Sequence, residues 1–116
     1  MPGVALSDAL QRVGASRVEA ALLDLLSREP DVSTKEAVEA TGLRQPEVSV
    51  GMRELVDRDW VECAPIPREG RGRPMHRYRL VASSAQLLTH YEALGRQAKV
   101  DLEHAMQTLV ATWARP

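Results

Sequence analysis

The residues best suited to chemistry in this sequence are arginines, and the chemistry that they suit is the binding of anions. Two of them, Arg71 and Arg73, alternate with glycines in the run Glu-Gly-Arg-Gly-Arg-Pro at 69–74. Glycine lets a backbone approach a phosphate ridge, and arginine can enter a narrow minor groove, where the electrostatic potential is most negative. The alternative is that the run is only the tip of a hairpin, because basic glycine-rich loops are common. The elements on either side of the run are needed to distinguish these two interpretations.

A second group of candidate residues lies on one side of residues 45–57, Q-P-E-V-S-V-G-M-R-E-L-V-D. Its apolar side chains recur at the spacing of one helical face; they are Val48, Met52, Leu55 and Val56. The opposite side carries Val50 and Arg53 beside Ser49. In a DNA major groove, valine can meet a thymine methyl group and arginine can pair with guanine. The alternative is an ordinary surface helix with one stray valine.

The segments before and after this helix predict how it is positioned. Capping boxes predict helix starts after Ser16 and Ser33, and glycines predict helix ends at Gly14 and Gly42. We therefore expect helices over about 5–13, 17–28 and 34–40, a brief strand at 31–33, and the helix that begins at Gln45. Two helices joined by a tight glycine turn predict a helix-turn-helix. From Trp60 the period changes to two, which predicts strands over 60–66 and 75–81, joined by the arginine-rich run.

A long helix is predicted over about 85–114, with Ser83 or Ser84 as its cap. One apolar stripe follows it through some seven turns and comprises Leu87, Tyr91, Leu94, Ala98, Leu102, Ala105, Leu109 and Trp113. The first half of the stripe could pack on its own domain. A domain this small cannot cover all of it, and a bare stripe would be an exposed apolar patch. We therefore expect a homodimer through this helix.

Composition narrows the class of protein. The 116 residues suffice for one domain, and the single cysteine, Cys63, excludes an internal disulfide. No apolar run has the ~18 residues of a membrane span, and we expect no signal peptide, a cytoplasmic location and no cofactor. The net charge is −1, yet residues 68–79 contain five arginines and one glutamate. The excess positive charge is therefore concentrated in one segment.

The order of these elements resembles the winged-helix transcription regulators, particularly the archaeal TrmB-like group and its MarR and ArsR relatives. The resemblance covers about residues 10–81 and rests on V-S-T-K-E-A-V-E-A-T-G-L-R-Q-P-E-V-S-V-G-M-R-E-L-V-D-R-D-W-V and E-G-R-G-R-P-M-H-R-Y-R-L. Two positions depart from the family pattern: Val50 is usually polar or basic, which puts base specificity in doubt, and Asp59 stands where glycine is usual.

The resemblance implies a mainly α (α+β) fold, a winged helix-turn-helix over 1–82 with a two-stranded wing, and a dimerisation helix over 83–116. It implies a homodimeric regulator that binds double-stranded DNA, with a small-molecule effector left open. The residues expected at DNA are Arg44, Gln45, Pro46, Glu47, Ser49, Val50 and Arg53 on the recognition helix, and Arg68, Arg71, Gly72 and Arg73 in the wing. The larger TrmB-like proteins carry a sugar-binding domain, for which we expect no room here.

The sequence gives weaker support to three functions other than DNA binding. A metal site is disfavoured because His76, His90 and His104 lack the acid-x-His spacing of the ArsR helical site. An enzyme is disfavoured because no nucleophile arrangement or P-loop is present. The main rival is a winged helix that contacts proteins, since Glu47 and Glu54 would repel phosphate.

Overall fold

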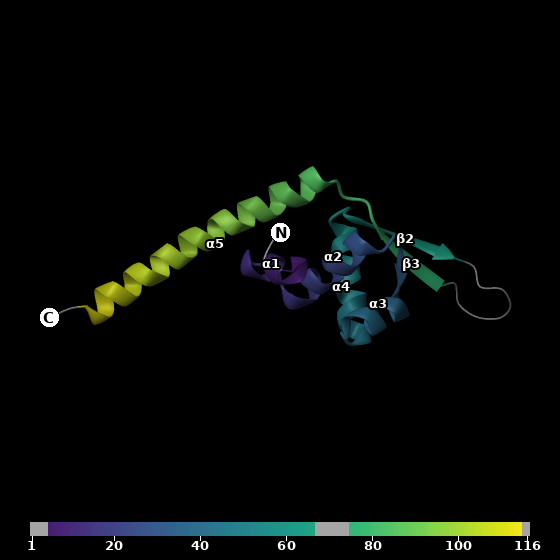
Figure 1. Ribbon diagram of the computed structural model, residues 1–116, viewed down its shortest axis with the longest axis horizontal. Coiled ribbons are helices and arrows are strands. Elements are labelled where there is room, and N and C mark those ends of the chain that lie inside the picture. Colours follow the sequence, from purple (N-terminus) through teal and green to yellow (C-terminus); the bar gives the residue numbers. More distant parts are fainter. Residues whose placement is uncertain (1–4, 67–74, 115–116) are drawn as a thin grey trace.

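The structure, a computed structural model, describes residues 5–66 and 75–114, and within these ranges the chain forms five helices and three strands (Figure 1). The helices are α1 (Leu6–Arg12), α2 (Arg17–Arg28), α3 (Thr34–Thr41), α4 (Gln45–Asp57) and α5 (Ser84–Trp113). The strands are β1 (Val32–Ser33), β2 (Val61–Ile66) and β3 (Met75–Leu80). The predicted fold, mainly helical with a two-stranded hairpin and a long C-terminal helix, is confirmed.

Short-range caps explain why the helices begin where they do. The Ser33 hydroxyl accepts a hydrogen bond from the Glu36 backbone N–H at 3.1 Å, and the Glu36 carboxylate accepts one from the Ser33 N–H at 3.0 Å. This is the predicted capping box of α3. At α2 the Ser16 hydroxyl accepts from the Glu19 N–H at 3.1 Å, but the reciprocal bond is not formed. The box predicted there is half correct, because the Glu19 carboxylate binds partners from other elements.

Two left-handed residues set the path of the chain around α4. Gly42 ends α3 with a φ of 74°, as predicted, and α4 begins three residues later at Gln45. After α4, Asp59 has a φ of 62°, and it is the one residue other than glycine with a positive φ in the described part of the chain. Aspartate tolerates this conformation better than most residues do. The turn that usually uses glycine is therefore made here by Asp59.

The sheet fixes the hairpin against the helix-turn-helix. β3 is the central strand, with β1 and β2 antiparallel on its two sides, and Val32 of β1 lies opposite Tyr78 of β3. The guanidinium group of Arg77 on β3 forms ion pairs with Asp31, just before β1, and with Glu36 of α3, the latter at 2.8 Å. The pairing of β1 with β3 was not predicted. It ties the entry of α3 to the hairpin, so both have a defined orientation relative to α4.

The core lies where α2 crosses α4. Leu22 of α2 and Val48, Met52 and Leu55 of α4 are fully buried, and Val56 is half-buried against the same core, which confirms the predicted inner face. Gly51 is also buried, and a Cβ atom built on it would lie 2.6 Å from Leu22 Cδ1. The two helices therefore approach closely at a position where only glycine fits without displacement.

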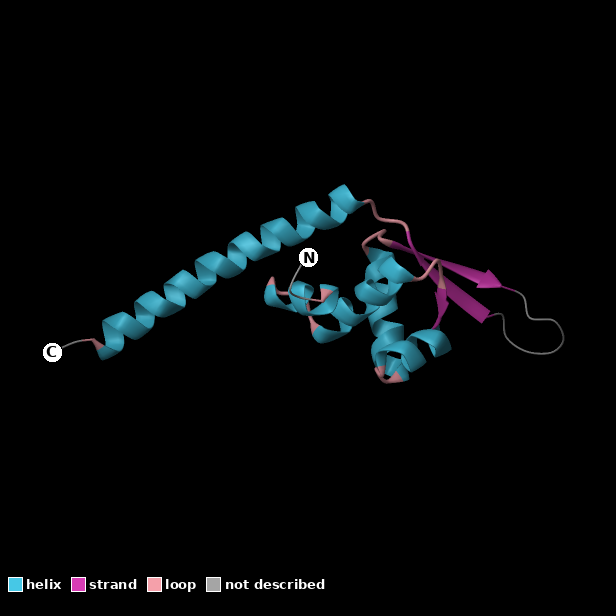
Figure 2. Cartoon of the chain, viewed as in Figure 1, coloured by secondary structure: helices cyan, strands magenta, loops and turns pink. Residues whose placement is uncertain are grey.

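α5 leaves the other helices and extends far beyond them, which gives the molecule a longest dimension of 76 Å (Figures 1 and 2). Its first half packs on the domain, with Tyr91 buried and Leu87 and Leu94 half-buried against the core. From Lys99 to Trp113 every side chain is exposed. Within residues 5–66 and 75–114, no helix has the length and apolar character needed to cross a membrane.

Candidate nucleic-acid interface

The outer face of α4 is the side of the helix opposite its buried residues, and its side chains point toward solvent. Gln45, Pro46, Val50 and Arg53 are exposed, and Ser49 is half-buried. Val50 is unusual here because 53% of this apolar residue is exposed. The predicted recognition residues of α4 therefore lie together on the side of the helix that does not pack against the protein.

Val50 lines a hollow rather than a flat surface. The hollow is open, has a volume of about 410 Å³, and lies between the first turn of α2 and the side of α4. Its walls are formed by Ser16, Val18, Pro46, Glu47, Val50, Gly51 and Glu54. Val18, Pro46 and Val50 give it apolar walls, so a methyl group could enter it without losing hydrogen bonds.

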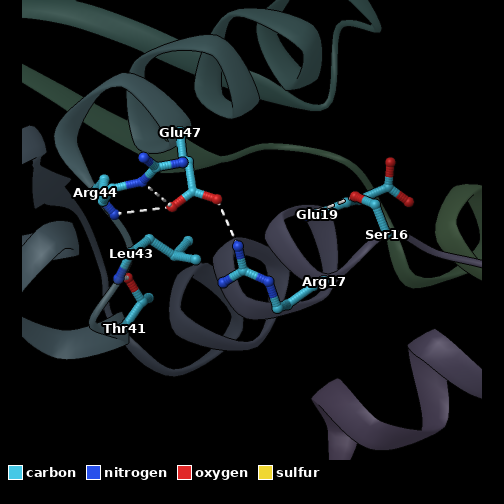
Figure 3. A network of polar contacts seen from close by, with 7 residues as sticks. All are labelled: Ser16, Arg17, Glu19, Thr41, Leu43, Arg44 and Glu47. Atoms are coloured by element: carbon cyan, nitrogen blue, oxygen red, sulfur yellow. Dashed lines mark hydrogen bonds and ion pairs between the residues drawn. The ribbon is translucent and has the colours of Figure 1, made fainter.

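At the N-terminal end of α4, the Glu47 carboxylate joins two arginines from different elements (Figure 3). Its Oε1 atom accepts hydrogen bonds from the Arg44 backbone N–H at 3.1 Å and from Arg44 Nε at 3.4 Å. Its Oε2 atom accepts one from an Arg17 guanidinium nitrogen at 2.5 Å. These bonds, first that from the Arg44 backbone and then the Arg17 charge, lower the pKa of Glu47. The carboxylate therefore stays ionised at neutral pH.

The other end of α4 is attached to α5 through a second charged group. Arg58, directly after α4, forms an ion pair with Glu19 of α2 at 2.8 Å, and the Tyr91 hydroxyl of α5 donates to the same carboxylate at 2.5 Å. The Arg58 guanidinium also lies 5.0 Å from the Trp60 ring centre. Burial and the neighbouring Glu19 raise the pKa of Tyr91. These contacts connect the recognition helix to the long helix.

The two hairpin strands are joined by a further charged pair. Glu62 of β2 pairs with Arg79 of β3 at 2.6 Å across the hairpin. The arginines and glycine expected in the wing lie outside the described residues; they are Arg68, Arg71, Gly72 and Arg73. Their contact with DNA stays a prediction.

The three histidines lie in different parts of the structure. His76 Nδ1 lies 3.7 Å from Cys63 Sγ on the hairpin, His90 packs edge-on against Trp60, and His104 is exposed on the outer half of α5. In the described ranges no three metal-binding side chains converge.

Sequence reasoning missed Arg17, Glu19 and Arg58 as parts of this region. Arg17 and Glu47 are 30 positions apart, and Tyr91 and Glu19 are 72 apart. No local periodicity connects residues so distant in sequence. The capping pattern at Ser16 was the one local sign that the first turn of α2 mattered.

Comparisons with known proteins agree with this architecture. A model of the MarR family matches residues 13–72, which is just over half of the chain. No curated protein matches the chain by sequence.

Three solved structures illustrate the similarity in fold. A possible transcriptional regulator from Methanosarcina mazei has a TM-score of 0.59 at 11% identity, covering 87% of this chain and 86% of that chain. MarR from E. coli in its apo form has a TM-score of 0.56 at 17% identity, covering 96% and 86%. A mutant MarR from E. coli complexed with operator DNA has a TM-score of 0.55 at 15% identity, covering 90% and 82%. Identities this low establish a shared fold alone, the winged helix.

Proposed function

Because this chain belongs to the MarR family of transcription regulators, we propose that it is a homodimer that binds a specific double-stranded DNA sequence and thereby regulates transcription. The observation that carries the proposal is the exposed outer face of α4. Val48, Met52 and Leu55 on the inner face of α4 are fully buried, so the side chains on the opposite side of the helix point outward. A helix held in this way can enter a major groove with its N-terminal residues at the base edges.

Arg53, Ser49 and Val50 are the residues to which we assign base recognition. Arg53 has the donors and the reach to bind guanine O6 and N7, a contact worth about 1–3 kcal/mol of discrimination. Ser49 can form a short hydrogen bond to a base or phosphate. Val50 offers an apolar contact for a thymine methyl group, and the apolar hollow beside it accommodates such a group.

The remaining predicted contacts are assigned to the edges of the groove. We propose that Gln45, Pro46 and Glu47, in the first turn of α4, lie at the major groove, and that Arg44, which directly precedes the helix, lies near the DNA backbone. We propose that the wing residues enter the adjacent minor groove; they are Arg68, Arg71, Gly72 and Arg73. Both surfaces would then contact one duplex.

The outer half of α5 supports the homodimer. It exposes the predicted Leu102, Leu109 and Trp113, together with the unpredicted Val100, Met106 and Val110, and 78% of Trp113 is exposed. A second copy of this helix would cover the stripe, with two-fold symmetry. The predicted interface also includes Ala105 of the outer half and four residues of the packed half; the latter are Leu87, Tyr91, Leu94 and Ala98. We therefore assign 1–82 to DNA binding and 83–116 to dimerisation, within one structural unit.

Selection of bound duplexes from a random pool tests this function. We expect the parent protein to enrich a two-fold symmetric sequence, with half-sites about one helical turn, ~34 Å, apart. Arg53→Ala should relax the preference at one position in each half-site. If the parent enriches no sequence, the regulator is excluded and a role in protein contact or DNA architecture remains. The cytoplasmic location and the narrower resemblance to the archaeal TrmB-like group stay predictions.

A further inference from the structure

We propose that Arg17 and Arg44 together bind the DNA backbone beside the N-terminal end of α4, and that Glu47 is the positioning residue that holds both guanidinium groups there. The inference rests on the proposed function, because it requires α4 to enter the major groove. It adds Arg17, which lies on α2 outside the helix-turn-helix, to the residues that contact DNA.

The geometry of the three side chains presents positive charge outward. Only 19% of the Glu47 side chain is exposed, against 63% of Arg17 and 83% of Arg44. Each carboxylate oxygen already accepts hydrogen bonds from one of the arginines. An approaching phosphate would therefore meet two guanidinium groups before the carboxylate, and the net charge of the three groups is positive.

Arg17, Arg44 and Glu47 lie where a contact with the DNA backbone is expected. The N-terminal residues of a recognition helix reach the base edges, so residues flanking that end lie near the phosphates that border the groove. Arg44 directly precedes α4, and Arg17 begins α2 on the side where Ser16 and Val18 line the hollow beside Val50. The first turn of α2 is thus next to the outer face of α4.

Glu47 acts in this arrangement by limiting the motion of its partners. A free arginine side chain loses much rotamer freedom when it binds a phosphate, and a side chain already held loses less. Arginine has five donors in a fixed fork, so the bonds to Glu47 leave other N–H groups for phosphate. The expectation that Glu47 chiefly repels phosphate is therefore replaced here by a positioning role.

The first test compares two arginines of α2 that have similar exposure and one carboxylate partner each, but lie at opposite ends of the helix. Arg28, at the opposite end of the helix, is 61% exposed and pairs with one carboxylate, Asp24, so it matches Arg17 closely. Binding to a short duplex of random sequence is measured between about 50 and 200 mM salt. Arg17→Ala should weaken binding on the order of tenfold and reduce the log–log salt slope by about 0.9 per lost phosphate contact. Arg28→Ala should change neither quantity appreciably.

The second test compares two glutamates of α4. Glu54→Gln removes a negative charge near DNA without releasing an arginine, so binding should become tighter. Glu47→Gln removes the same charge but releases Arg17 and Arg44, so binding should become several-fold weaker. Glutamine can still cap the helix, and thermal unfolding of each variant reports any loss of fold separately. A purely structural role for Glu47 would change the unfolding temperature and leave the salt dependence as it is.

The outcomes separate this inference from the proposed function. If the parent binds duplex DNA while Arg17→Ala behaves like Arg28→Ala, the Arg17 contact is refuted and the regulator is unaffected. If Glu47→Gln tightens binding as Glu54→Gln does, Glu47 repels phosphate and does not position the arginines. If the parent does not bind duplex at any salt, both proposals fail.

Discussion

Replacing Gly51 by alanine tests the close crossing of α2 and α4, on which the position of the outer face of α4 depends. The new Cβ atom would lie 2.6 Å from Leu22 Cδ1 and 2.8 Å from Val18 Cγ1. Relaxed carbon–carbon contacts are about 3.5–4.0 Å, and Leu22 is fully buried, so it cannot move without displacing its neighbours. Overpacking of this kind costs about 1–3 kcal/mol. Alanine's higher helix propensity offsets about 1 kcal/mol of that cost.

Gly95→Ala is the matched control, because the same substitution in α5 meets an ordinary contact. Its Cβ atom would lie 3.5 Å from Val13 Cγ1, which requires no displacement. This variant should therefore gain the full helix-propensity term of about 1 kcal/mol. The difference in unfolding free energy between the two variants then isolates the packing cost, which we expect to be about 1–3 kcal/mol.

The assay is urea unfolding followed by far-ultraviolet circular dichroism. All variants are compared at one protein concentration, because dimerisation would make the apparent stability depend on concentration. Gly51→Ala should unfold at a lower urea concentration than the parent, and Gly95→Ala at a higher one. Equal stabilisation by both substitutions would show that α2 and α4 do not cross this closely, and the reasoning would be refuted.

Three further predictions concern the dimer, the wing and the capping carboxylates. Leu102→Glu should give monomer or insoluble protein, whereas light scattering of the parent should give twice the 12.8 kDa chain mass; a parent of single-chain mass would contradict the dimer. Arg71→Ala combined with Arg73→Ala should weaken binding to all duplexes alike and reduce the log–log slope of affinity against salt by roughly one unit per lost phosphate contact. If binding were unchanged at every salt concentration, the wing would not contribute to DNA binding. The pKa values of Glu36 and Glu47 are both lowered, chiefly by backbone hydrogen bonds from Ser33 and Arg44. Their stabilisation is thus present above their ordinary pKa of about 4.3 and should be lost as pH falls below it, which urea midpoints across that range would detect.

The helices and strands could be predicted because their determinants are close in sequence. The capping box of Ser33 and Glu36, the left-handed Gly42 and the apolar spacing of α4 each involve residues at most a few positions apart. The predicted α4 boundaries, Gln45 to Asp57, match the structure. The stripe along α5 also showed in advance which helix would leave apolar surface uncovered.

The surroundings of the outer face were decided by tertiary structure. From the sequence alone, Glu47 is expected to repel phosphate. In the folded chain its second carboxylate oxygen accepts a hydrogen bond from Arg17, which is 30 positions earlier in the sequence. Gly51 carried no local sign of its importance, because its role depends on Leu22 and Val18 of another helix. Periodicity tells which side of a helix faces inward, since that depends on spacing alone. Which groups meet at a helix crossing depends on how two helices pack, and spacing within either helix does not contain that information.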